Sequence, residues 1–409
     1  MRAFQVSPNE AGQRLDKLLA KYMDTAPKSF FYKMLRKKNI TLNGKKAEGS
    51  EKVAEGDEIR LFLSEETIEG FQSDKRRGAG GAVATELKEK SLPTVKKGGV
   101  ETTDGMCEAG ELGRQAPMLK AYEIVFEGKH LLIANKPAGE LSQKAKKDDV
   151  SINERIVEYL KITQGIGQDS FTPGVCNRLD RNTTGLIIAG KSLAGLQEMA
   201  ELLKNRSLHK YYLCLVAGTA EKKQHLTGYL KKDAGTNMVQ VVSEEDFKKL
   251  GLNAGEYDRI ETELIPLLTK NGYSLAAIQL ITGKTHQIRA HLASIGLPLL
   301  GDTKYQGSEM HNSGKIKGSA EQQKKQQLVK GCLEQVNRGL HLRYQLLHAY
   351  MLQFPKLNGA LSEVSEAVIT VEPPAKFART AEELFGKEEW KHAIMEFERL
   401  KRLRTGGAD

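Results

Sequence analysis

The sequence predicts an α+β fold divided between a small N-terminal part and a larger C-terminal part. The 409 residues are too many for one ordinary hydrophobic core, which favours two or three domains. From residue 121 onward, short apolar runs typical of strands outnumber the helical patterns, and this mixture indicates an α+β domain. Residues 71–119, between the two parts, show neither the helical nor the strand periodicity of apolar residues.

The N-terminal part has the spacing of two amphipathic helices followed by short strands. Apolar residues recur at helical spacing from Leu15 to Tyr22 and again from Phe30 to Leu35, with Pro27 between them. Asn-Gly between apolar residues is a hairpin signal. Strands are predicted at residues 40–42 and 58–63, with the turn at Asn43-Gly44.

Residues 71–119 are predicted to be a flexible linker or a disordered insertion. They contain 8 Gly in 49 positions, with 8 basic and 7 acidic residues and almost no aromatic ones. An RNA-contacting loop is the alternative, but the near-zero net charge disfavours it.

Composition indicates a soluble globular protein that binds an acidic partner. Hydrophobic residues make up 39% and charged residues 28% of the chain, and no run of 18 apolar residues or signal-peptide core is present. The four cysteines form no CxxC pair, so we expect neither a zinc knuckle nor a disulfide framework. This use of cysteine predicts a location in the reducing cytoplasm. The net charge is +10, and residues 1–46 hold 11 Lys and Arg against 3 Asp and Glu, a net of +8. Nucleic acid is the partner this charge favours.

The larger part is predicted to alternate strands with a few helices. Residues 308–340 are polar and are interpreted as an insertion. Helices are predicted at 151–163, 193–203, 284–294 and 379–403, and strands at 123–126, 131–134, 186–189, 211–217, 225–230, 236–242, 260–268 and 273–282.

The run from Asn177 to Gly190 carries the strongest signal of chemistry. It places Asp180 between Arg178 and Arg181, on a turn that leads into an apolar strand. Nearby opposite charge lowers the pKa of a carboxyl group, so this aspartate should stay ionised. Taken alone, the run is more typical of a surface ion pair than of a catalytic carboxylate.

Two further segments place polar groups at turns. Residues 135–139 (Asn-Lys-Pro-Ala-Gly) form a turn with a cation, for which a structural role is equally possible. Residues 283–289 (Gly-Lys-Thr-His-Gln-Ile-Arg) lack the earlier glycine that a phosphate-binding P-loop needs, because Ile278 stands there. A metal site is disfavoured, since no His-Glu-x-x-His spacing or third ligand is present.

The N-terminal part resembles the S4 RNA-binding domain. The similarity lies in residues 12–19, 36–45 and 53–57 and covers about residues 10–70. In that family the second helix and the following loop face RNA. The resemblance therefore implies RNA contacts for Lys33, Arg36, Lys37, Lys38 and Lys45. Asp16, in the first Arg-Leu-Asp sequence, is interpreted as structural and paired with a nearby base.

The larger part resembles the RluA family of RNA pseudouridine synthases, in particular the RluC/RluD-like branch that acts on large-subunit rRNA. The resemblance implies an α+β catalytic domain with a mixed or antiparallel sheet. It also implies that uridine in 23S rRNA is the substrate. The similar segments are 135–139, 178–185 (Arg-Leu-Asp-Arg-Asn-Thr-Thr-Gly), 210–218, 283–292, 298–305 (Pro-Leu-Leu-Gly-Asp-Thr-Lys-Tyr) and 347–349.

The resemblance also implies roles for individual residues. Asp180 is then the catalytic aspartate, Tyr212 stacks on the target base, and Arg289 pairs with Asp180. Arg178 is expected to position RNA or Asp180. No metal or cofactor is expected. The protein is expected to be a monomer. Further RNA contacts are expected from Arg181, Lys136, Lys284, His286 and Gln287.

Two departures from the family pattern concern the site. Asn177 stands where the family usually has His, which leaves target choice open, and Thr184 stands where Ser is usual. A non-catalytic RNA-binding or ribosome-assembly factor and a base-releasing N-glycosidase remain the alternatives. The predicted domains are 1–70 (S4-like), 71–119 (linker), 120–375 (catalytic) and 376–409 (C-terminal helical extension).

Overall fold

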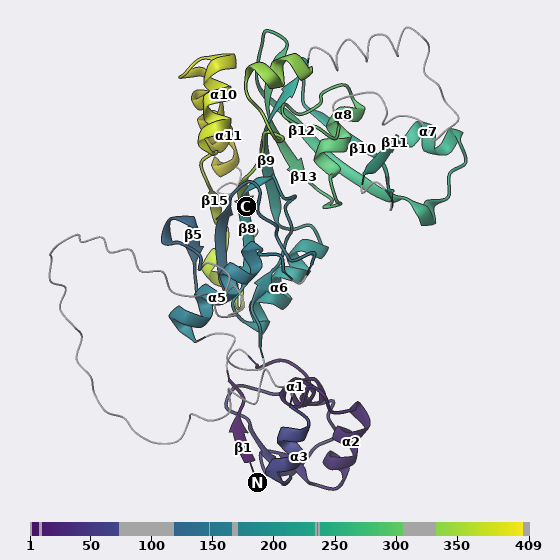
Figure 1. The fold of residues 1–409 in the computed structure, drawn as a ribbon, viewed down its shortest axis with the longest axis vertical. Coiled ribbons are helices and arrows are strands. Elements are labelled where there is room, and N and C mark those ends of the chain that lie inside the picture. Colours follow the sequence, from purple (N-terminus) through teal and green to yellow (C-terminus); the bar gives the residue numbers. More distant parts are fainter. Residues whose placement is uncertain are drawn as a thin grey trace, which may run out of the picture. The chain divides into compact units, whose positions relative to one another are not determined.

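The computed structural model forms two compact units, which are described separately (Figure 1). The small unit comprises residues 1–117 and 167–172, and the large unit comprises residues 118–166 and 173–409. The structure describes residues 2–7, 10–72, 118–146, 148–165, 171–233, 235, 238–305 and 333–403. The predicted linker at 71–119 and insertion at 308–340 therefore fall largely outside the described residues.

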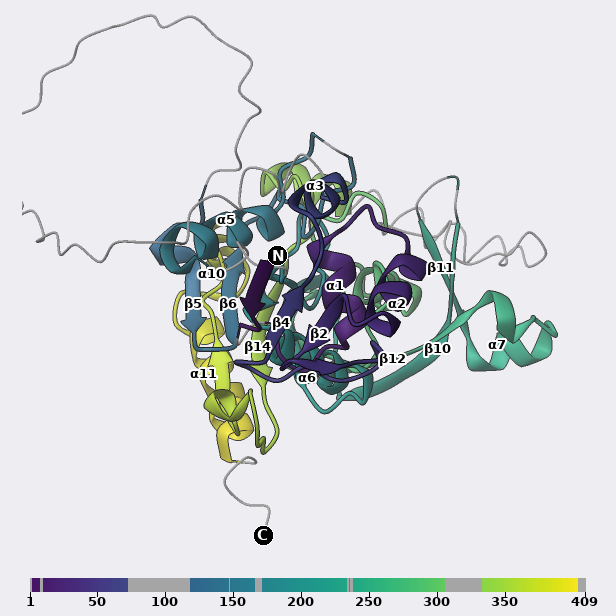
Figure 2. The same ribbon diagram turned by 90° about the horizontal axis from the view of Figure 1, so that it is seen from below.

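The small unit packs its helices against a four-stranded sheet of order β1-β4-β2-β3 (Figure 2). The two predicted helices and the Asn43-Gly44 hairpin are present, and both turn residues have positive φ angles. The core combines Leu15, Leu18 and Leu19 with apolar residues of the second helix and the strands. The elements are β1 (Arg2–Gln5), α1 (Leu15–Tyr22), α2 (Lys28–Arg36), β2 (Ile40–Leu42), β3 (Lys45–Lys46), β4 (Glu58–Leu61) and α3 (Glu65–Gly70).

The large unit is built on an eleven-stranded sheet whose central path is β11-β10-β12-β13-β9-β14-β8-β6-β5. The pairs on this path are antiparallel except for β14 with β8, which are parallel, so the sheet is mixed as expected. The strands are β5 (Ile124–Glu127), β6 (Leu131–Lys136), β7 (Gly174–Val175), β8 (Thr184–Gly190), β9 (His209–Ala217), β10 (Gln224–Lys232), β11 (Val239–Ser243), β12 (Asp258–Lys270), β13 (Tyr273–Leu280), β14 (Leu347–Gln353) and β15 (Val368–Thr370).

Helices cover both faces of this sheet. Alternate residues along a strand point to opposite sides, and on β9 both sides carry side chains that are buried in a core. Tyr212 and Cys214 of β9 belong to the core beneath α5 and α8. Tyr211 and Leu213 of the same strand belong to a second core, which they share with residues of α10 and α11. The longer helices are α5 (Ile152–Gln164), α6 (Leu193–Lys204), α7 (Glu244–Lys249), α8 (Gln287–Ser294), α10 (Ala375–Phe385) and α11 (Glu389–Leu403).

The C-terminal region differs from the sequence prediction. The single helix expected at 379–403 is two helices, which Gly386 separates with a φ of +102°. Phe377 of α10 and Trp390 of α11 are buried in the core of the large unit. These helices therefore belong to that unit and are not an extension. In the described part of the chain, no helix is both long and apolar enough to cross a membrane.

Candidate active site

Asp180 lies on a loop between β7 and β8 that polar contacts hold on both sides. Ser142 forms two hydrogen bonds with the backbone of Leu179. Its hydroxyl donates to the Leu179 carbonyl at 2.8 Å and accepts from the Leu179 N–H at 2.9 Å. After the aspartate, the Thr183 N–H donates to the Asp180 carbonyl at 3.0 Å. The Gln345 amide donates to the Thr183 hydroxyl at 3.3 Å. The backbone that carries the carboxylate is thus fixed before any substrate binds.

The strand after this loop begins with a hydroxyl side chain at position 184 and requires glycine at position 185. Gly185 has a φ of +106°, and a Cβ at this position would lie 2.2 Å from the carbonyl oxygen of Ala349 on β14. The Thr184 hydroxyl bonds to His348 Nδ1 at 2.8 Å, and His348 Nε2 lies 2.9 Å from the Val371 carbonyl. A carbonyl only accepts, so Nε2 carries the proton and Thr184 donates to Nδ1. Burial lowers the pKa of His348 to about 4 and keeps it neutral. Thr184 therefore supplies the hydroxyl in place of the usual Ser.

Asn177 also has a structural role. Its side-chain oxygen accepts the N–H of Ile188 on β8 at 2.8 Å, which ties the start of the loop to the strand. The departure from His at this position leaves the support of the loop in place.

Two residues for which RNA contacts were expected are held by internal hydrogen bonds. Lys136 is 0% exposed, and its ammonium donates to the carbonyls of Pro137, Glu140 and Arg181 at 2.8–2.9 Å. The prediction of RNA contact by Lys136 is wrong, because tertiary packing encloses its ammonium. Gln287 is 2% exposed, and both atoms of its amide are used within the protein, with Thr262 and Thr282 among their partners. Gln287 nevertheless lines the cavity that contains Asp180, so its RNA contact stays a prediction.

Replacing Lys136 with Met is expected to destabilise the large unit by about 2–3 kcal/mol, because three buried carbonyls lose their donor. Urea unfolding followed by Trp390, the one tryptophan of the chain, measures this. RNA affinity should stay at the wild-type value. The same change at the exposed Lys129 is the control and should alter neither quantity. A stable Lys136→Met protein with weakened RNA binding would restore the original interpretation.

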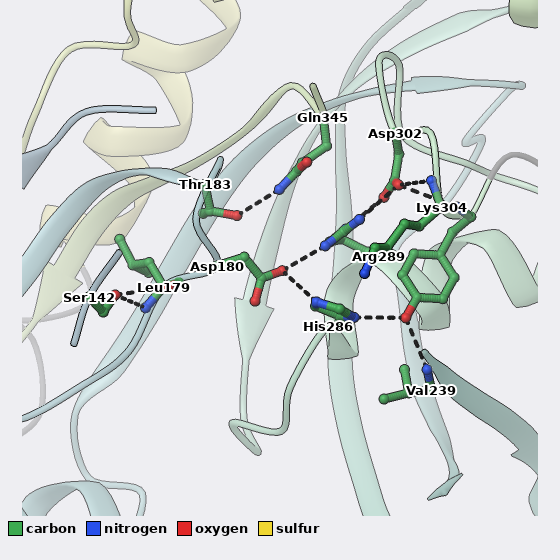
Figure 3. A network of polar contacts seen from close by, with 11 residues as sticks. Ser142, Leu179, Asp180, Thr183, Val239, His286, Arg289, Asp302, Lys304 and Gln345 are labelled. Atoms are coloured by element: carbon green, nitrogen blue, oxygen red, sulfur yellow. Dashed lines mark hydrogen bonds and ion pairs between the residues drawn. The ribbon is translucent and has the colours of Figure 1, made fainter. Parts of the chain in front are cut away.

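Arg289 joins Asp180 to a second, fully buried carboxylate (Figure 3). Its Nη1 donates to Asp180 Oδ2 at 3.1 Å, while Nε and Nη2 donate to the two oxygens of Asp302 at 2.7 and 2.9 Å. Burial alone would lower the pKa of Arg289, but Asp302 and Asp180 outweigh this and raise it above its ordinary value. The guanidinium thus stays charged. Two of its nitrogens are held by Asp302, while the third donates to Asp180.

Asp302 is itself oriented by backbone donors. Its Oδ1 accepts the N–H groups of Lys304 and Tyr305 at 2.9 and 3.2 Å. The Arg289 guanidinium also lies 5.1 Å from the centre of the Tyr305 ring. The contacts from Asp302 to Asp180 form one continuous network.

Tyr212 and Asp180 line one cavity, which is open to solvent. Arg289, Arg178, Lys284 and His286 also line it, and Leu280, Ile288 and Leu347 supply apolar wall. The side chain of Tyr212 is nearly buried, and burial together with the charge of Asp180 raises its pKa above the usual value. Tyr212 therefore presents a neutral aromatic ring to the cavity beside a charged carboxylate.

The remaining predicted RNA contacts of the large unit are exposed or lie beside the cavity. Arg178 and Arg181 are exposed, although the sequence places them beside Asp180. In the part of the chain that is described, Asp180 forms an ion pair with Arg289, and His286 Nε2 lies 4.0 Å from the same carboxylate oxygen. Lys284 forms an exposed ion pair with Asp258 at 2.6 Å.

The five predicted RNA contacts of the small unit are exposed. They lie on α2 and in the residues that follow it, namely Lys33, Arg36, Lys37, Lys38 and Lys45. Asp16 is paired with Arg14 by two hydrogen bonds of 3.1 Å and accepts the Tyr32 hydroxyl at 2.8 Å. Asp16 is thus a structural residue paired with a nearby basic residue, as predicted.

Four residues that support the site were not predicted from the sequence, namely Asp302, Tyr305, Ser142 and Gln345. A signal existed for the first two, since the 298–305 segment contains an Asp-x-x-Tyr spacing close behind Arg289. An arginine expected inside a site needs a carboxylate partner of its own, and Asp302 is the acid in that segment. Ser142 and Gln345 have no comparable signal.

The chain is similar to several known proteins. Residues 130–294 match a family model described as RNA pseudouridylate synthase. An uncharacterized RNA pseudouridine synthase of Mycoplasma genitalium is 26% identical over 359 residues, covering 87% of this chain and 90% of that protein. The ribosomal large subunit pseudouridine synthase C of Escherichia coli K12 is 25% identical over 304 residues, covering 73% and 78%.

Among solved structures, human RNA pseudouridylate synthase domain containing 4 is 23% identical, with a TM-score of 0.45. The match covers 64% of this chain and 92% of that one. The matched family model, together with relatives named as ribosomal large subunit pseudouridine synthases C and D, supports an RNA pseudouridine synthase, an isomerase, that is similar to members of the RluA family.

Proposed function

We propose that the substrate is uridine in 23S rRNA, that of the large ribosomal subunit, and that Asp180 performs the chemistry. The proposal of substrate rests on relatives named as ribosomal large subunit pseudouridine synthases C and D. The exposed lysines and arginine on and after α2 support it, since such groups neutralise phosphates. A cytoplasmic location and a monomeric state stay predictions.

The observation that carries the catalytic proposal is the setting of Asp180. Its carboxylate is fixed by Arg289 at 3.1 Å and opens into the same cavity as the Tyr212 ring. In the reaction, the C1′–N1 bond of uridine breaks, a C1′–C5 bond forms, and a proton leaves C5 while N1 gains one. A fixed carboxylate can attack C1′ or remove a proton at C2′.

The neighbouring groups suit the intermediate stage, in which the uracil is detached. The aromatic face of Tyr212 is expected to hold the base while it turns. Arg289 keeps Asp180 charged and fixes its rotamer. A base in structured RNA must first leave its stack to enter a cavity of this kind.

Large-subunit rRNA labelled with tritium at uridine C5 tests the proposal, because forming the C1′–C5 bond expels the label. The rRNA should come from a strain that lacks the protein, so that its target uridine is unmodified. Pseudouridine synthase activity releases tritium with the RNA chain intact and without free uracil. Release of free uracil would indicate an N-glycosidase, and absence of any release would favour a non-catalytic rRNA-binding factor.

The small unit is proposed to bind RNA as an S4-like domain through its basic residues. Changing Arg36 and Lys37 to Gln and Lys38 to Asn should weaken RNA binding. It should also reduce the slope of log affinity against log salt by about 0.7–0.9 for each phosphate that the variant no longer neutralises. Asn suits position 38, where φ is +59°. Binding measured from low to high salt gives both quantities.

A control removes the same charge elsewhere. Lys129, Lys204 and Lys356 are exposed on the large unit and lie outside the cavity lining. Their triple change to Gln should leave the salt slope closer to wild type. Equal slopes for the two triple variants would show that net charge alone, rather than the α2 surface, determines binding.

A further inference from the structure

The two oxygens of Asp180 have different surroundings. Oδ2 accepts from Arg289 Nη1 at 3.1 Å, and His286 Nε2 lies 4.0 Å from the same atom (Figure 3). No hydrogen bond within the described residues reaches Oδ1. One oxygen is therefore approached by two nitrogens, while the other is left to the cavity.

The tautomer of His286 is determined by Tyr305. The hydroxyl of this fully buried tyrosine accepts the Val239 N–H of β11 at 3.0 Å and lies 2.8 Å from His286 Nδ1. Burial raises the pKa of Tyr305 to about 12, so the phenol keeps its proton. With Val239 as a donor, that proton is available to Nδ1, and the imidazole proton then lies on Nε2, which faces Asp180.

The backbone of His286 supports a defined position for this ring. Its φ is +54°, in the left-handed region that non-glycine residues seldom adopt. Such a conformation persists where the surrounding structure enforces it, often at functional sites. Burial lowers the pKa of His286; Asp180 and Asp302 oppose this, while Arg289 and Lys304 add to it. A neutral ring with an Nε2 proton follows.

We propose that His286, held by Tyr305, is a positioning residue that shares Oδ2 of Asp180 with Arg289 and so leaves Oδ1 as the atom that reacts with the ribose. This role differs from the RNA contact expected from the sequence, and it rests on the proposed catalytic role of Asp180. The 4.0 Å gap is longer than a hydrogen bond, and such contacts commonly shorten when substrate binds. Closing it would fix the carboxylate plane in the reactive complex.

Two substitutions of His286 separate this role from a purely structural one. Gln can place an amide N–H near the position of Nε2, whereas Asn reaches only to the position of Nδ1. Asn, however, is the residue better suited to a positive φ. A positioning role therefore predicts that His286→Gln is faster than His286→Asn, and a structural role predicts the opposite order.

The measurement is single-turnover tritium release with saturating enzyme, together with the Kd for the same RNA. We expect His286→Asn to be slower than His286→Gln by about tenfold, on the order of one hydrogen bond to a charged group. The Kd should match wild type in both. His341 provides the matched control, since it is exposed, has a φ of +49° and lies outside the cavity lining. Its Asn and Gln variants should keep the wild-type rate.

Tyr305→Phe gives an independent test through non-additivity. In the wild-type background it removes the group that selects the tautomer, and the rate should fall several-fold. In the His286→Gln background, which has no tautomer to select, the Tyr305→Phe change should lower the rate little further.

The outcomes distinguish this inference from the proposed function. A wild-type protein that releases no tritium from its rRNA overturns the proposed function. An active wild type overturns only the role of His286 if Asn equals or exceeds Gln, if the Tyr305→Phe loss is the same in both backgrounds, or if the variants lose only RNA affinity.

Discussion

Replacing Asp180 with Asn is expected to lower the single-turnover rate of pseudouridine formation by at least about 1000-fold, which corresponds to about 4 kcal/mol. Asn keeps the size of the side chain and an oxygen that can accept from Arg289, but it removes the negative charge. A neutral amide is neither a nucleophile toward C1′ nor a base toward C2′. The affinity for rRNA should change little, because the backbone contacts of Leu179 and Thr183 hold the loop without the carboxylate.

Tritium release from labelled rRNA measures the rate, and binding of the same RNA supplies the second quantity. Asp246→Asn is the control, because Asp246 is an exposed carboxylate of α7 that lies outside the cavity lining. It should behave as wild type. An Asp180→Asn protein that retains substantial activity would remove Asp180 from the chemistry.

Replacing Asp302 with Ala is expected to destabilise the large unit by about 3–5 kcal/mol, the cost typical of removing one partner from a buried ion pair. The Asp302 side chain is 0% exposed and that of Arg289 only 7%, so little solvent screens the charge that remains. The rate should fall as well, since Arg289 loses the two bonds that direct its fork toward Asp180.

Urea unfolding followed by Trp390 fluorescence tests this, because Trp390 is buried in the core of the large unit. Glu263→Ala is an instructive comparison. Glu263 pairs with Lys223 at 2.6 Å, but the side chain of Lys223 is 55% exposed. Loss of that pair should cost less than about 1 kcal/mol. Similar costs for the two variants would mean that burial does not set the strength of the Arg289 network.

The sequence predicts most strands of the large unit because their alternation or apolar runs are local features. It fails at Gly386, because the amphipathic pattern continues across the break between α10 and α11. The family resemblance brought Arg289 to Asp180 although 109 residues separate them. Local reasoning favoured Arg178 and Arg181, yet adjacency in the chain does not direct two side chains to the same place.

Burial of polar side chains was the least predictable property. Lys136 is a charged residue in a turn, a combination that usually indicates exposure. Its environment depends on carbonyls from Pro137, Glu140 and Arg181, and the last of these is 45 residues away. Tyr305 is comparable, since its partners Val239 and His286 come from different elements. Such enclosures arise from tertiary structure and leave no local pattern.

The parallel pairing of β8 with β14 has a consequence for the order of biosynthesis. Thr184 and His348 are bonded across 164 residues, so the strand that follows Asp180 cannot be completed until β14 has been synthesised. The small unit, in contrast, draws its core from within the first 72 residues. On the ribosome, all core residues of the small unit, which is proposed to bind RNA, are therefore synthesised well before the catalytic loop can be completed.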